Sequence, residues 1–356
     1  MSARTVLLTG ASGFIGKHLL RRYLDEPETE LYLLQRAASR KRLDDFLERD
    51  LDDARRAKVH VVEGNIAQPD LGLEPATRDS LAHSATHIIH AAAVYDLQMT
   101  RAVGMRVNMG GTRHVLDFAK QCRALERLAY FSTIAVSGLF EGVYTEDDCD
   151  VGQSFKNHYD ETKFLAERLV RERADALPIT ILRPTVVVGD TETGAFEKID
   201  GPYHALVMIA RNMHLVVQNA GNAKCHMAPV DFIADAAHAL THDPETRGGT
   251  YHLGDPNPMT YNAFYDAVCE RWGKIKPLLK LPPAMIKPMF YLPGFAHLTG
   301  VSYEAFQYSY HRVEYDMSRA QEALARHGIA CPPVSSYLDA FLAYFKAHYR
   351  DPDIRK

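Results

Sequence analysis

The stretch Thr5-Val6-Leu7-Leu8-Thr9-Gly10-Ala11-Ser12-Gly13-Phe14-Ile15-Gly16 decides how this chain folds. Residues 5–8 form a β-like run, and apolar residues recur at helical spacing from 14 to 24, so the three glycines stand between a strand and a helix. Glycine allows the tight turn, the approach of backbone to a pyrophosphate and the close helix–sheet packing that a dinucleotide site requires. The helix N-terminus adds free N–H groups and a favourable dipole. We therefore expect a dinucleotide here, bound by Gly10, Ser12, Gly13, Phe14, Ile15 and Gly16.

Strand-like runs alternate with amphipathic stretches through the first half of the chain. We expect strands at 5–8, 31–34, 59–62, 87–93, 128–132, 180–188 and 249–253, and helices at 14–24, 110–123, 158–176 and 229–241. Continuous apolar strands that alternate with helices are typical of a parallel sheet covered on both faces. The expected fold is therefore α/β, a doubly wound parallel sheet of the Rossmann type with a smaller, mostly helical C-terminal lobe.

The alternation stops after Gly189, and residues 256–356 are rich in proline and aromatic residues. We predict a dinucleotide-binding domain of residues 1–190 with 225–255, and a substrate-binding lobe of residues 191–224 with 256–356. Within 284–300 the sequence leaves open an acyl channel, a surface-seeking segment or ordinary core. The apolar residues of this segment are Met285, Ile286, Met289, Phe290, Tyr291, Leu292, Phe295 and Leu298.

Composition excludes several classes of protein. The net charge of −4 argues against a general binder of nucleic acid. No apolar run approaches the roughly 20 residues that span a bilayer, and the N-terminus lacks the pattern of a signal peptide. The five cysteines have no paired spacing, and His204, His214 and His226 form no metal-binding set. We therefore expect a cytoplasmic protein without a disulfide framework, a metal site or a transmembrane segment.

The end of the second expected strand indicates which dinucleotide binds. An acidic residue there would bind the ribose hydroxyls of NAD, whereas an arginine accommodates a 2′-phosphate. The chain reads Leu33-Leu34-Gln35-Arg36, with Arg40 close behind and no carboxylate at the tip. A solvated basic turn is the alternative interpretation. The sequence favours NADP(H) over NAD(H), with Arg36 against the phosphate.

Tyr159 and Lys163 stand four residues apart on one face of an expected helix. A lysine beside a tyrosine favours the phenolate and lowers the phenol pKa, so that the phenol can exchange a proton with a substrate near neutral pH. The pair alone is weak evidence, because about one such pair is expected by chance. It follows a strand that ends at Ser132-Thr133, where a hydroxyl points toward the crevice in which sheets of this type bind ligands. We predict that Thr133 binds the reacting carbonyl and that Tyr159 gives it a proton.

Together these motifs resemble the extended short-chain dehydrogenase/reductase family over essentially the whole chain. The further matching elements are Gly64-Asn65-Ile66, His90-Ala91-Ala92-Ala93, Asn108-Met109-Gly110-Gly111-Thr112 and Arg183-Pro184-Thr185. The resemblance implies that Asn65 and Ile66 flank the adenine and that Lys163 reaches the nicotinamide ribose. It also implies that Thr133, rather than Ser132, is the catalytic hydroxyl. Cofactor contacts are likewise implied for Ala91, Ala92, Ala93, Pro184, Thr185 and Val186.

Two positions qualify the resemblance. The family usually has Asp where Asn65 stands, but an amide can still hydrogen-bond adenine. Asn108 more often braces the sheet than reacts, so it is not placed in the catalytic set. Dimerisation through the helices at 110–123 and 158–176 is an expectation from the family alone.

Within the family, the chain looks like the branch of fatty acyl-CoA reductases and thioester-reductase domains. The residues that carry this likeness are Phe131 to Val136, Thr145-Glu146-Asp147, Tyr159 to Glu167 and Pro229-Val230-Asp231-Phe232. The resemblance implies an NADPH-dependent reductase of a hydrophobic carbonyl or acyl thioester, with peripheral membrane contact left open. The alternatives are a dehydrogenase or ketoreductase of a bulky secondary alcohol, a nucleotide-sugar epimerase or dehydratase, and a non-catalytic NADP sensor.

Overall fold

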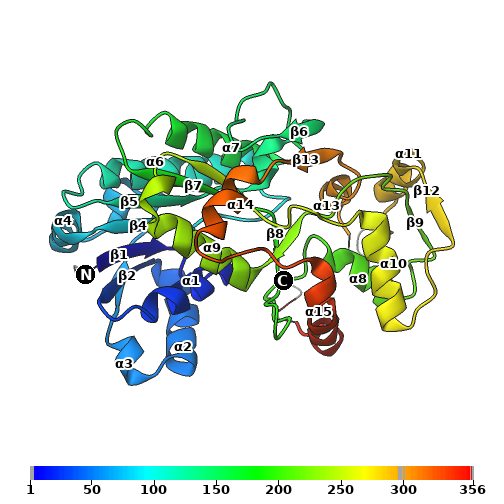
Figure 1. Ribbon diagram of the computed structural model, residues 1–356, viewed down its shortest axis with the longest axis horizontal. Helices are drawn as coiled ribbons and strands as arrows, with labels where there is room; N and C mark the ends of the chain where they lie inside the picture. The colour runs from blue at the N-terminus through cyan, green and yellow to red at the C-terminus, as the bar shows by residue number, and fades with distance from the viewer. Residues whose placement is uncertain (1–3, 296–298, 300, 353, 355–356) are drawn as a thin grey trace.

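A computed structural model describes residues 4–295, 299, 301–352 and 354, and shows a seven-stranded sheet flanked by helices (Figure 1). The strand order is β11-β7-β5-β4-β1-β2-β3, and every pairing within this sheet is parallel. This order confirms the doubly wound α/β fold that the sequence predicts. The strands are β1 (Arg4–Thr9), β2 (Thr29–Gln35), β3 (Val59–Glu63), β4 (His87–His90), β5 (Arg127–Phe131), β7 (Ile179–Pro184) and β11 (Thr250–Leu253).

Helices bury both faces of this sheet, which explains why its strands read as continuous apolar runs. The helices before residue 250 are α1 (Phe14–Leu24), α2 (Arg40–Asp50), α3 (Asp53–Arg56), α4 (Pro75–Ser84), α5 (Arg101–Gly104), α6 (Gly110–Ala119), α7 (His158–Arg171), α8 (Tyr203–Ala210) and α9 (Val230–His242). Along β1, Val6 and Leu8 join the core beneath α1, α2 and α9, whereas Leu7 joins the core beneath α4, α6 and α7. Short turns of helix lie at η1 (Ala37–Ser39), η2 (Pro69–Gly72), η3 (Met105–Met109), η4 (Ile134–Ser137) and η5 (Pro244–Thr246).

Two expected strands are shorter than the sequence suggests. The strand expected at 87–93 ends at His90, because the chain then turns across the end of β1, where the Ala91 N–H donates to the Thr9 carbonyl at 3.2 Å. The strand expected at 180–188 divides at Thr185 into β7 and β8 (Val186–Val188). Pro184 has no N–H to donate, and the chain beyond it leaves β11 and pairs with β10 (Met227–Pro229).

Most of the remaining elements lie toward the end of the molecule drawn on the right in Figure 1. Residues of α8, α10 and α15 share one apolar cluster. The helix α14 instead contributes Ala320, Ala323 and Leu324 to the core beneath the sheet. Among the described helices, none is both long and apolar enough to cross a bilayer. These elements are β6 (Gly142–Tyr144), β9 (Val216–Gln218), α10 (Tyr261–Trp272), β12 (Leu279–Leu281), α11 (Pro283–Ile286), η6 (Lys287–Tyr291), α13 (Tyr303–Tyr308), β13 (Val313–Tyr315), α14 (Ser318–Ala325) and α15 (Val334–His348).

Candidate active site

The glycine loop makes a tight turn between β1 and α1. Gly10 has a φ of +83°, and a Cβ at this position would lie 2.7 Å from the backbone nitrogen of Ala92. A Cβ at Gly16 would collide with the Gly10 carbonyl oxygen, which accepts a hydrogen bond from the Gly13 N–H at 3.0 Å. Neither position can hold a larger residue unless the backbone moves.

The N-terminus of α1 is open to an anion. The helix begins at Phe14 with Gly13 as its N-cap, so no side chain caps it, and its first turn carries no acidic residue. Backbone N–H groups at a helix start bind phosphate oxygens readily when no side chain occupies them. Together with the glycine cradle, this arrangement fits the pyrophosphate of a dinucleotide.

Three further segments named from the sequence follow parallel strands, at the edge of the sheet where such folds bind ligands. The loop after β4 is held beside the glycine loop by the Thr9 side chain, whose Oγ1 accepts from the Ala92 N–H at 3.2 Å. After β3, Asn65 accepts a hydrogen bond from the Ala67 N–H at 3.0 Å, and Ile66 packs against Gly111. Thr185 follows β7 and is buried.

Arg36 follows β2 directly and is exposed. Among the described residues, its guanidinium has neither a hydrogen bond nor an ion pair. Arg40, in contrast, makes a two-oxygen ion pair with Asp44 at 2.8 and 2.9 Å. Of the two arginines named from the sequence, Arg36 is therefore the one whose charge is available to a ligand.

The hydroxyls of Thr133 and Tyr159 come together beyond the end of β5. Thr133 caps η4, where its Oγ1 accepts from the Ala135 N–H at 3.2 Å, and its side chain lies close to the Tyr159 phenol. Tyr159 is the second residue of α7. Ser132 is buried and donates to Glu167 at 2.5 Å. The Ser132 hydroxyl is thus hydrogen-bonded within the protein interior, so Thr133 is the residue of this pair that lies beside the Tyr159 phenol.

Lys163 lies behind this pair and does not act on Tyr159 as we expected. Its buried ammonium donates to the Phe131 carbonyl at 2.7 Å and to the Tyr130 hydroxyl at 3.2 Å. Burial lowers the pKa of Lys163 to about 8. The pKa of Tyr159 is raised, not lowered, by burial and by the nearby Asp160 carboxylate. In this structure the phenol is therefore held protonated, and the predicted direction of its pKa shift is wrong.

Sequence reasoning missed three residues around Tyr159. The Tyr95 ring meets the Tyr159 ring edge to face at 4.9 Å, and the Asp200 carboxylate lies near both phenols. Asp160 is fully buried, and its Oδ1 accepts a hydrogen bond from the Tyr308 hydroxyl at 2.5 Å. Burial raises the pKa of both carboxyls to about 6. Only Asp160 carried a signal in the sequence, because it stands inside the Tyr–Lys spacing.

A buried ion pair fixes α7 against the sheet. Glu167 and Arg183 have fully buried side chains and meet at 2.6 Å, and Arg171 joins Glu167 at 2.9 Å. The Arg183 and Arg171 guanidinium groups hold the pKa of Glu167 down to about 2, although burial opposes them. This network positions the helix that carries Tyr159. The sequence placed Arg183 in a family motif but gave no reason to pair it with Glu167.

Asn108 has the bracing role that we expected. It lies in η3, and its side-chain oxygen accepts from the Val94 N–H at 2.8 Å while its amide donates back to the Val94 carbonyl at 3.2 Å. It therefore holds the loop after β4 rather than facing Tyr159.

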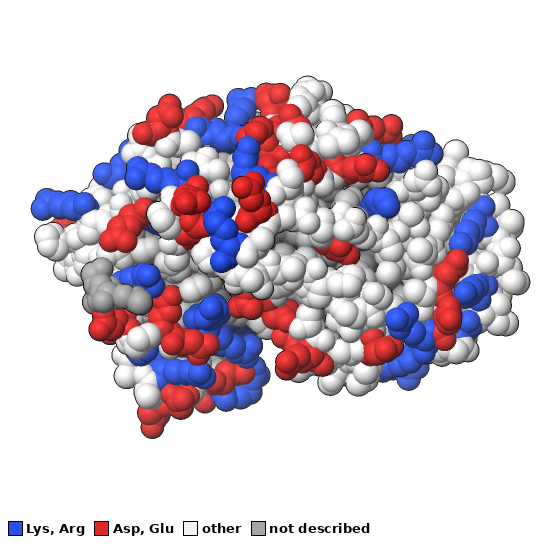
Figure 2. All heavy atoms as spheres, viewed as in Figure 1, with Lys and Arg blue, Asp and Glu red and all other residues white. Residues whose placement is uncertain are grey.

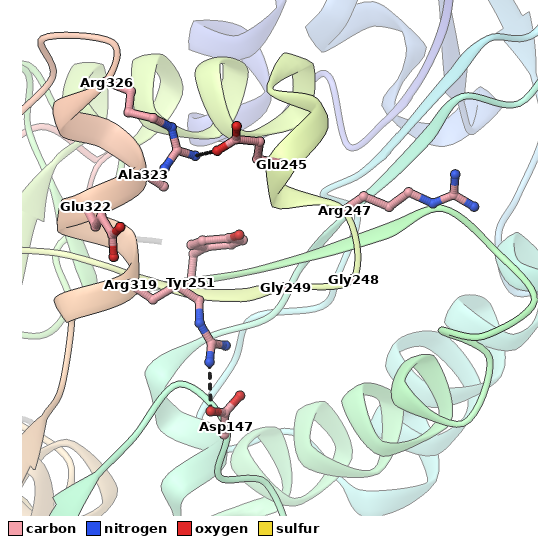
Figure 3. A pocket seen from close by; sticks show the side chains of 10 residues that line it. All are labelled: Asp147, Glu245, Arg247, Gly248, Gly249, Tyr251, Arg319, Glu322, Ala323 and Arg326. Atoms are coloured by element: carbon pink, nitrogen blue, oxygen red, sulfur yellow. Dashed lines mark hydrogen bonds and ion pairs between the residues drawn. The ribbon is translucent and has the colours of Figure 1, made fainter.

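One surface hollow lies next to Tyr159, and another lies at the amino end of β11. One, of about 580 Å³, is lined by Lys156, Asn157 and His158, immediately before Tyr159, and by residues 97–99. The other, of about 490 Å³, opens between the start of β11 and α14 (Figure 3). In that second hollow Arg319 pairs with Asp147 and Arg326 with Glu245, so its positive charge is largely balanced. The first hollow lies beside the candidate site.

Within the described part of the apolar segment 284–300, some side chains are exposed and others are buried. Met285, Met289, Tyr291 and Leu292 are exposed, whereas Ile286 is buried. Leu298 lies outside the described residues. Figure 2 shows this end of the molecule as a broad uncharged area with scattered charged groups. An acyl channel and a surface contact remain predictions for this segment.

The other groups named from the sequence are dispersed. His214 and His226 hydrogen-bond separate backbone carbonyls, of Ile275 at 2.9 Å and Val313 at 3.1 Å. All five cysteines are free thiols.

Comparison with known proteins identifies the family. The family model described as "Male sterility protein" matches residues 8–237, which is more than half of the chain. The chain belongs to the male sterility protein family. Members of this branch of the extended short-chain dehydrogenase/reductases are NAD(P)-dependent reductases, which confirms the resemblance drawn from the motifs.

Individual relatives agree with this assignment. A glycine betaine reductase of Emericella nidulans is 30% identical over 284 residues, covering 74% of this chain and 22% of that protein. The fatty acyl-CoA reductase wat of Drosophila melanogaster is 25% identical over 278 residues, covering 67% of this chain and 54% of that protein. The terminal R domain of the myxalamid biosynthetic pathway superposes with a TM-score of 0.82 at 26% identity, covering 99% of this chain and 93% of that one. The chain thus spans between about a quarter and half of these curated relatives, and nearly all of the R domain.

Proposed function

We propose that this protein is an NADPH-dependent reductase of a hydrophobic carbonyl compound, with an acyl thioester as the favoured substrate. The observation that carries the proposal is the proximity of the Thr133 side chain to the Tyr159 phenol at the carboxyl edge of the sheet. The loop after β1, whose glycines fit a dinucleotide, follows a strand of the same parallel sheet, which supports the assignment of Tyr159 as proton donor. Relatives that reduce fatty acyl-CoA support the thioester as substrate.

In this proposal the chain supplies binding, orientation and a proton, while bound NADPH supplies a hydride. The glycine loop would hold the pyrophosphate, and the segment from Pro184 to Val186 would contact the nicotinamide. Thr133 orients the carbonyl oxygen, and Tyr159 gives that oxygen its proton as the carbonyl carbon is reduced. With a thioester the C–S bond then breaks, which releases a thiol and leaves an aldehyde. Lys163 keeps Phe131 and the strand end in place through its own hydrogen bonds.

The pKa of Tyr159 supports the reductive direction. A proton donor must be protonated when substrate arrives, and burial with the Asp160 charge raises the pKa of this phenol. The phenol therefore remains protonated through the neutral and mildly alkaline range.

A substrate panel tests the proposal. Consumption of NADPH is measured with acyl-CoA, a fatty aldehyde, a ketone and a nucleotide sugar, and thiol release is followed in parallel with a thiol reagent. The proposal expects NADPH oxidation with stoichiometric CoA release from the acyl-CoA. Turnover of the ketone alone would assign the chain to the alcohol dehydrogenase alternative. NADPH binding without any turnover would support a sensor.

The preference for NADPH rests on Arg36, whose side chain is free, and the matched control is Arg40, which is paired with Asp44. We expect Arg36→Ala to weaken NADPH binding by about tenfold, which corresponds to about 1.4 kcal/mol, and to leave NADH binding nearly unchanged. Arg40→Ala should alter neither by more than about twofold. If Arg36→Ala weakens NADPH and NADH binding equally, the preference for NADPH does not depend on Arg36.

A further inference from the structure

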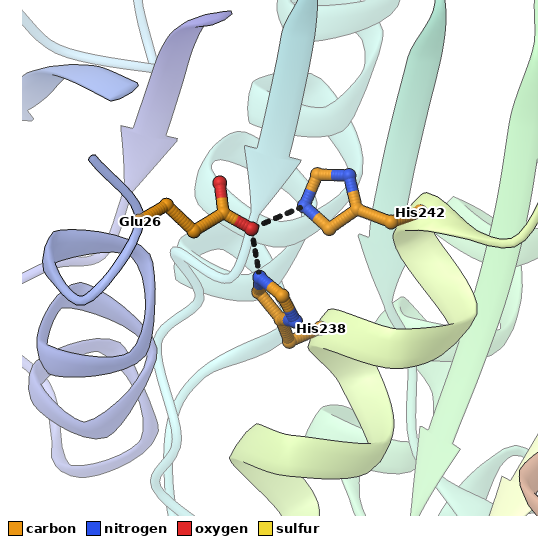
Figure 4. A group of neighbouring side chains, drawn as sticks. All are labelled: Glu26, His238 and His242. Carbon is orange, nitrogen blue, oxygen red and sulfur yellow. Dashed lines mark hydrogen bonds and ion pairs between the residues drawn. The ribbon is translucent and has the colours of Figure 1, made fainter. Parts of the chain in front are cut away.

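Glu26, His238 and His242 bring three metal-ligand atoms together at the edge of the sheet opposite the candidate active site (Figure 4). Glu26 Oε1 lies 2.7 Å from His238 Nε2 and 3.9 Å from His242 Nε2. All three ligand atoms lie within 4.8 Å of one another, and no other group of three His, Cys, Asp or Glu side chains in the described part of the chain gathers so closely.

The positions of the three side chains are set by two elements that pack together. His238 and His242 stand four residues apart on α9, so both imidazoles project from one face of that helix. Glu26 lies in the turn between α1 and β2. The helices α1 and α9 share the core beneath the sheet, which keeps the turn and the helix face in contact.

The carboxylate of Glu26 is already oriented as a ligand would need. Its Oε2 accepts hydrogen bonds from Arg4 Nη1 at 2.8 Å and from Thr29 Oγ1 at 2.7 Å. These two contacts turn Oε1 toward the imidazoles. Metal-bound carboxylates and imidazoles are usually held in this way by hydrogen bonds behind them.

His242 supplies the second observation. Its Nε2 is buried, and within the described structure it has no hydrogen-bond partner, although it points at the carboxylate (Figure 4). A buried polar nitrogen without a partner is costly, and a bound cation would satisfy it.

The surroundings of the cluster suit an ion that is shielded but reachable. The three side chains are between 11% and 18% exposed to solvent. The Tyr23 ring lies edge-on to both imidazoles, at 5.0 Å from His238 and 5.5 Å from His242. A partly enclosed set with two imidazole nitrogens and one carboxylate oxygen suits Zn²⁺, with water as a fourth ligand.

We propose that Glu26, His238 and His242 form a binding site for a divalent metal ion of the zinc class that ties α9 to the turn between α1 and β2. The site lies at the amino end of β1 and β4, away from Gly10 and Tyr159, so it stabilises the fold and does not take part in the reaction. It is independent of the proposed function. Sequence spacing does not reveal that Glu26 joins the two histidines, because 212 residues separate Glu26 from His238.

Zinc binding to the full chain tests this proposal. The protein is stripped with a chelator, titrated with Zn²⁺ by calorimetry, and melted with and without the metal. The proposal expects one equivalent of zinc and a higher melting temperature, because a ligand that binds the folded state stabilises it. Co²⁺ is then used as a coloured substitute and should give a visible spectrum without a thiolate charge-transfer band. Failure of the wild-type chain to bind zinc would leave an ion-pair cluster only and overturn the proposal.

Matched variants locate the site. His242→Gln and His238→Gln should each weaken zinc binding by at least about tenfold and abolish the thermal shift, whereas His60→Gln, which removes an exposed histidine paired with Glu30, should bind as the wild type does. Melting of each variant without metal shows that it folds. If a variant does not fold, protection of histidines 238 and 242 from chemical modification by zinc in the wild type decides the question. Unchanged binding in both variants, or unprotected histidines, would place the metal elsewhere and overturn the proposal.

Discussion

At the scale of single residues, the turn between β1 and α1 contains a position that admits glycine alone. Gly10 combines a positive φ with backbone atoms of Ala92 at contact distance, so two separate costs oppose any larger residue. Gly152 has a similar φ of +79°, but a Cβ there would meet no described atom within 4 Å. The two glycines therefore separate backbone strain from steric collision.

We predict that Gly10→Ala weakens NADPH binding by at least about tenfold, because the new methyl group displaces the backbone beside the pyrophosphate. In Gly152→Ala the only cost is the strain of a positive φ, which should lower the free energy of unfolding by about 1–2 kcal/mol. This variant should bind NADPH as the wild type does. Fluorescence titration with NADPH and urea denaturation measure the two effects. Equal losses of NADPH binding in the two variants would contradict the close approach at Gly10.

Asp160 gives a prediction about pH. Burial raises the pKa of this carboxyl from 3.8 to about 6, although Lys156, Tyr308 and Asn157 oppose the shift. Between these values the folded chain binds a proton that the unfolded chain has lost, so this group makes stability fall as pH rises from about 4 to about 6. Asp160→Asn removes the titrating group. The difference in unfolding free energy between Asp160→Asn and the wild type should therefore change across this window and level off above it. A difference that is the same at every pH would show that Asp160 does not titrate there.

At the scale of secondary-structure elements, the position of α7 determines where Tyr159 lies. The helix is fixed to the sheet by the Glu167–Arg183 pair, in which both side chains are fully buried. Removing one partner of a buried pair leaves the other charge without compensation, which is far more costly than losing an exposed pair. Arg168, on the same helix, pairs with Asp150 in the preceding loop; both side chains are about half exposed, and this pair serves as the comparison.

We predict that Arg183→Met lowers the free energy of unfolding by about 3–5 kcal/mol. Arg168→Met should change it by no more than about 0.5 kcal/mol. Chemical denaturation at pH 7 measures both variants. A loss in Arg183→Met as small as that in Arg168→Met would mean that the buried pair does not hold the helix.

At the scale of the whole molecule, the sequence predicts what depends on local pattern. The apolar run before Gly10 and the helical spacing after it predict β1 and α1, because period and glycine position are local properties. The strand break at Thr185 was missed, because it depends on a partner strand more than 40 residues away, β10 (Met227–Pro229). Asp200 and Tyr95 were missed for the same reason. Tertiary contacts alone bring them to Tyr159.

The ionisation and hydrogen bonds of the site residues were harder to predict from the sequence than their positions on the helix. The spacing of Tyr159 and Lys163 placed both on α7, but the pKa of the phenol depends on its burial and on Asp160, which spacing does not reveal. The Lys163 ammonium is directed to Tyr130 and Phe131 by the packing of α7 on β5. The pattern thus predicted which helix carries Tyr159 and Lys163, and the three-dimensional environment sets their ionisation.

If Tyr159 protonates the substrate in an NADPH-dependent reduction, loss of its hydroxyl must slow the reaction without weakening NADPH binding. Thiol release from acyl-CoA is measured with NADPH for the wild type, for Tyr159→Phe and for the control Tyr32→Phe, which removes a hydroxyl on β2. We predict that Tyr159→Phe lowers kcat by about 10²–10⁴-fold while NADPH affinity stays within about twofold, and that Tyr32→Phe matches the wild type. Full turnover in Tyr159→Phe would contradict the account.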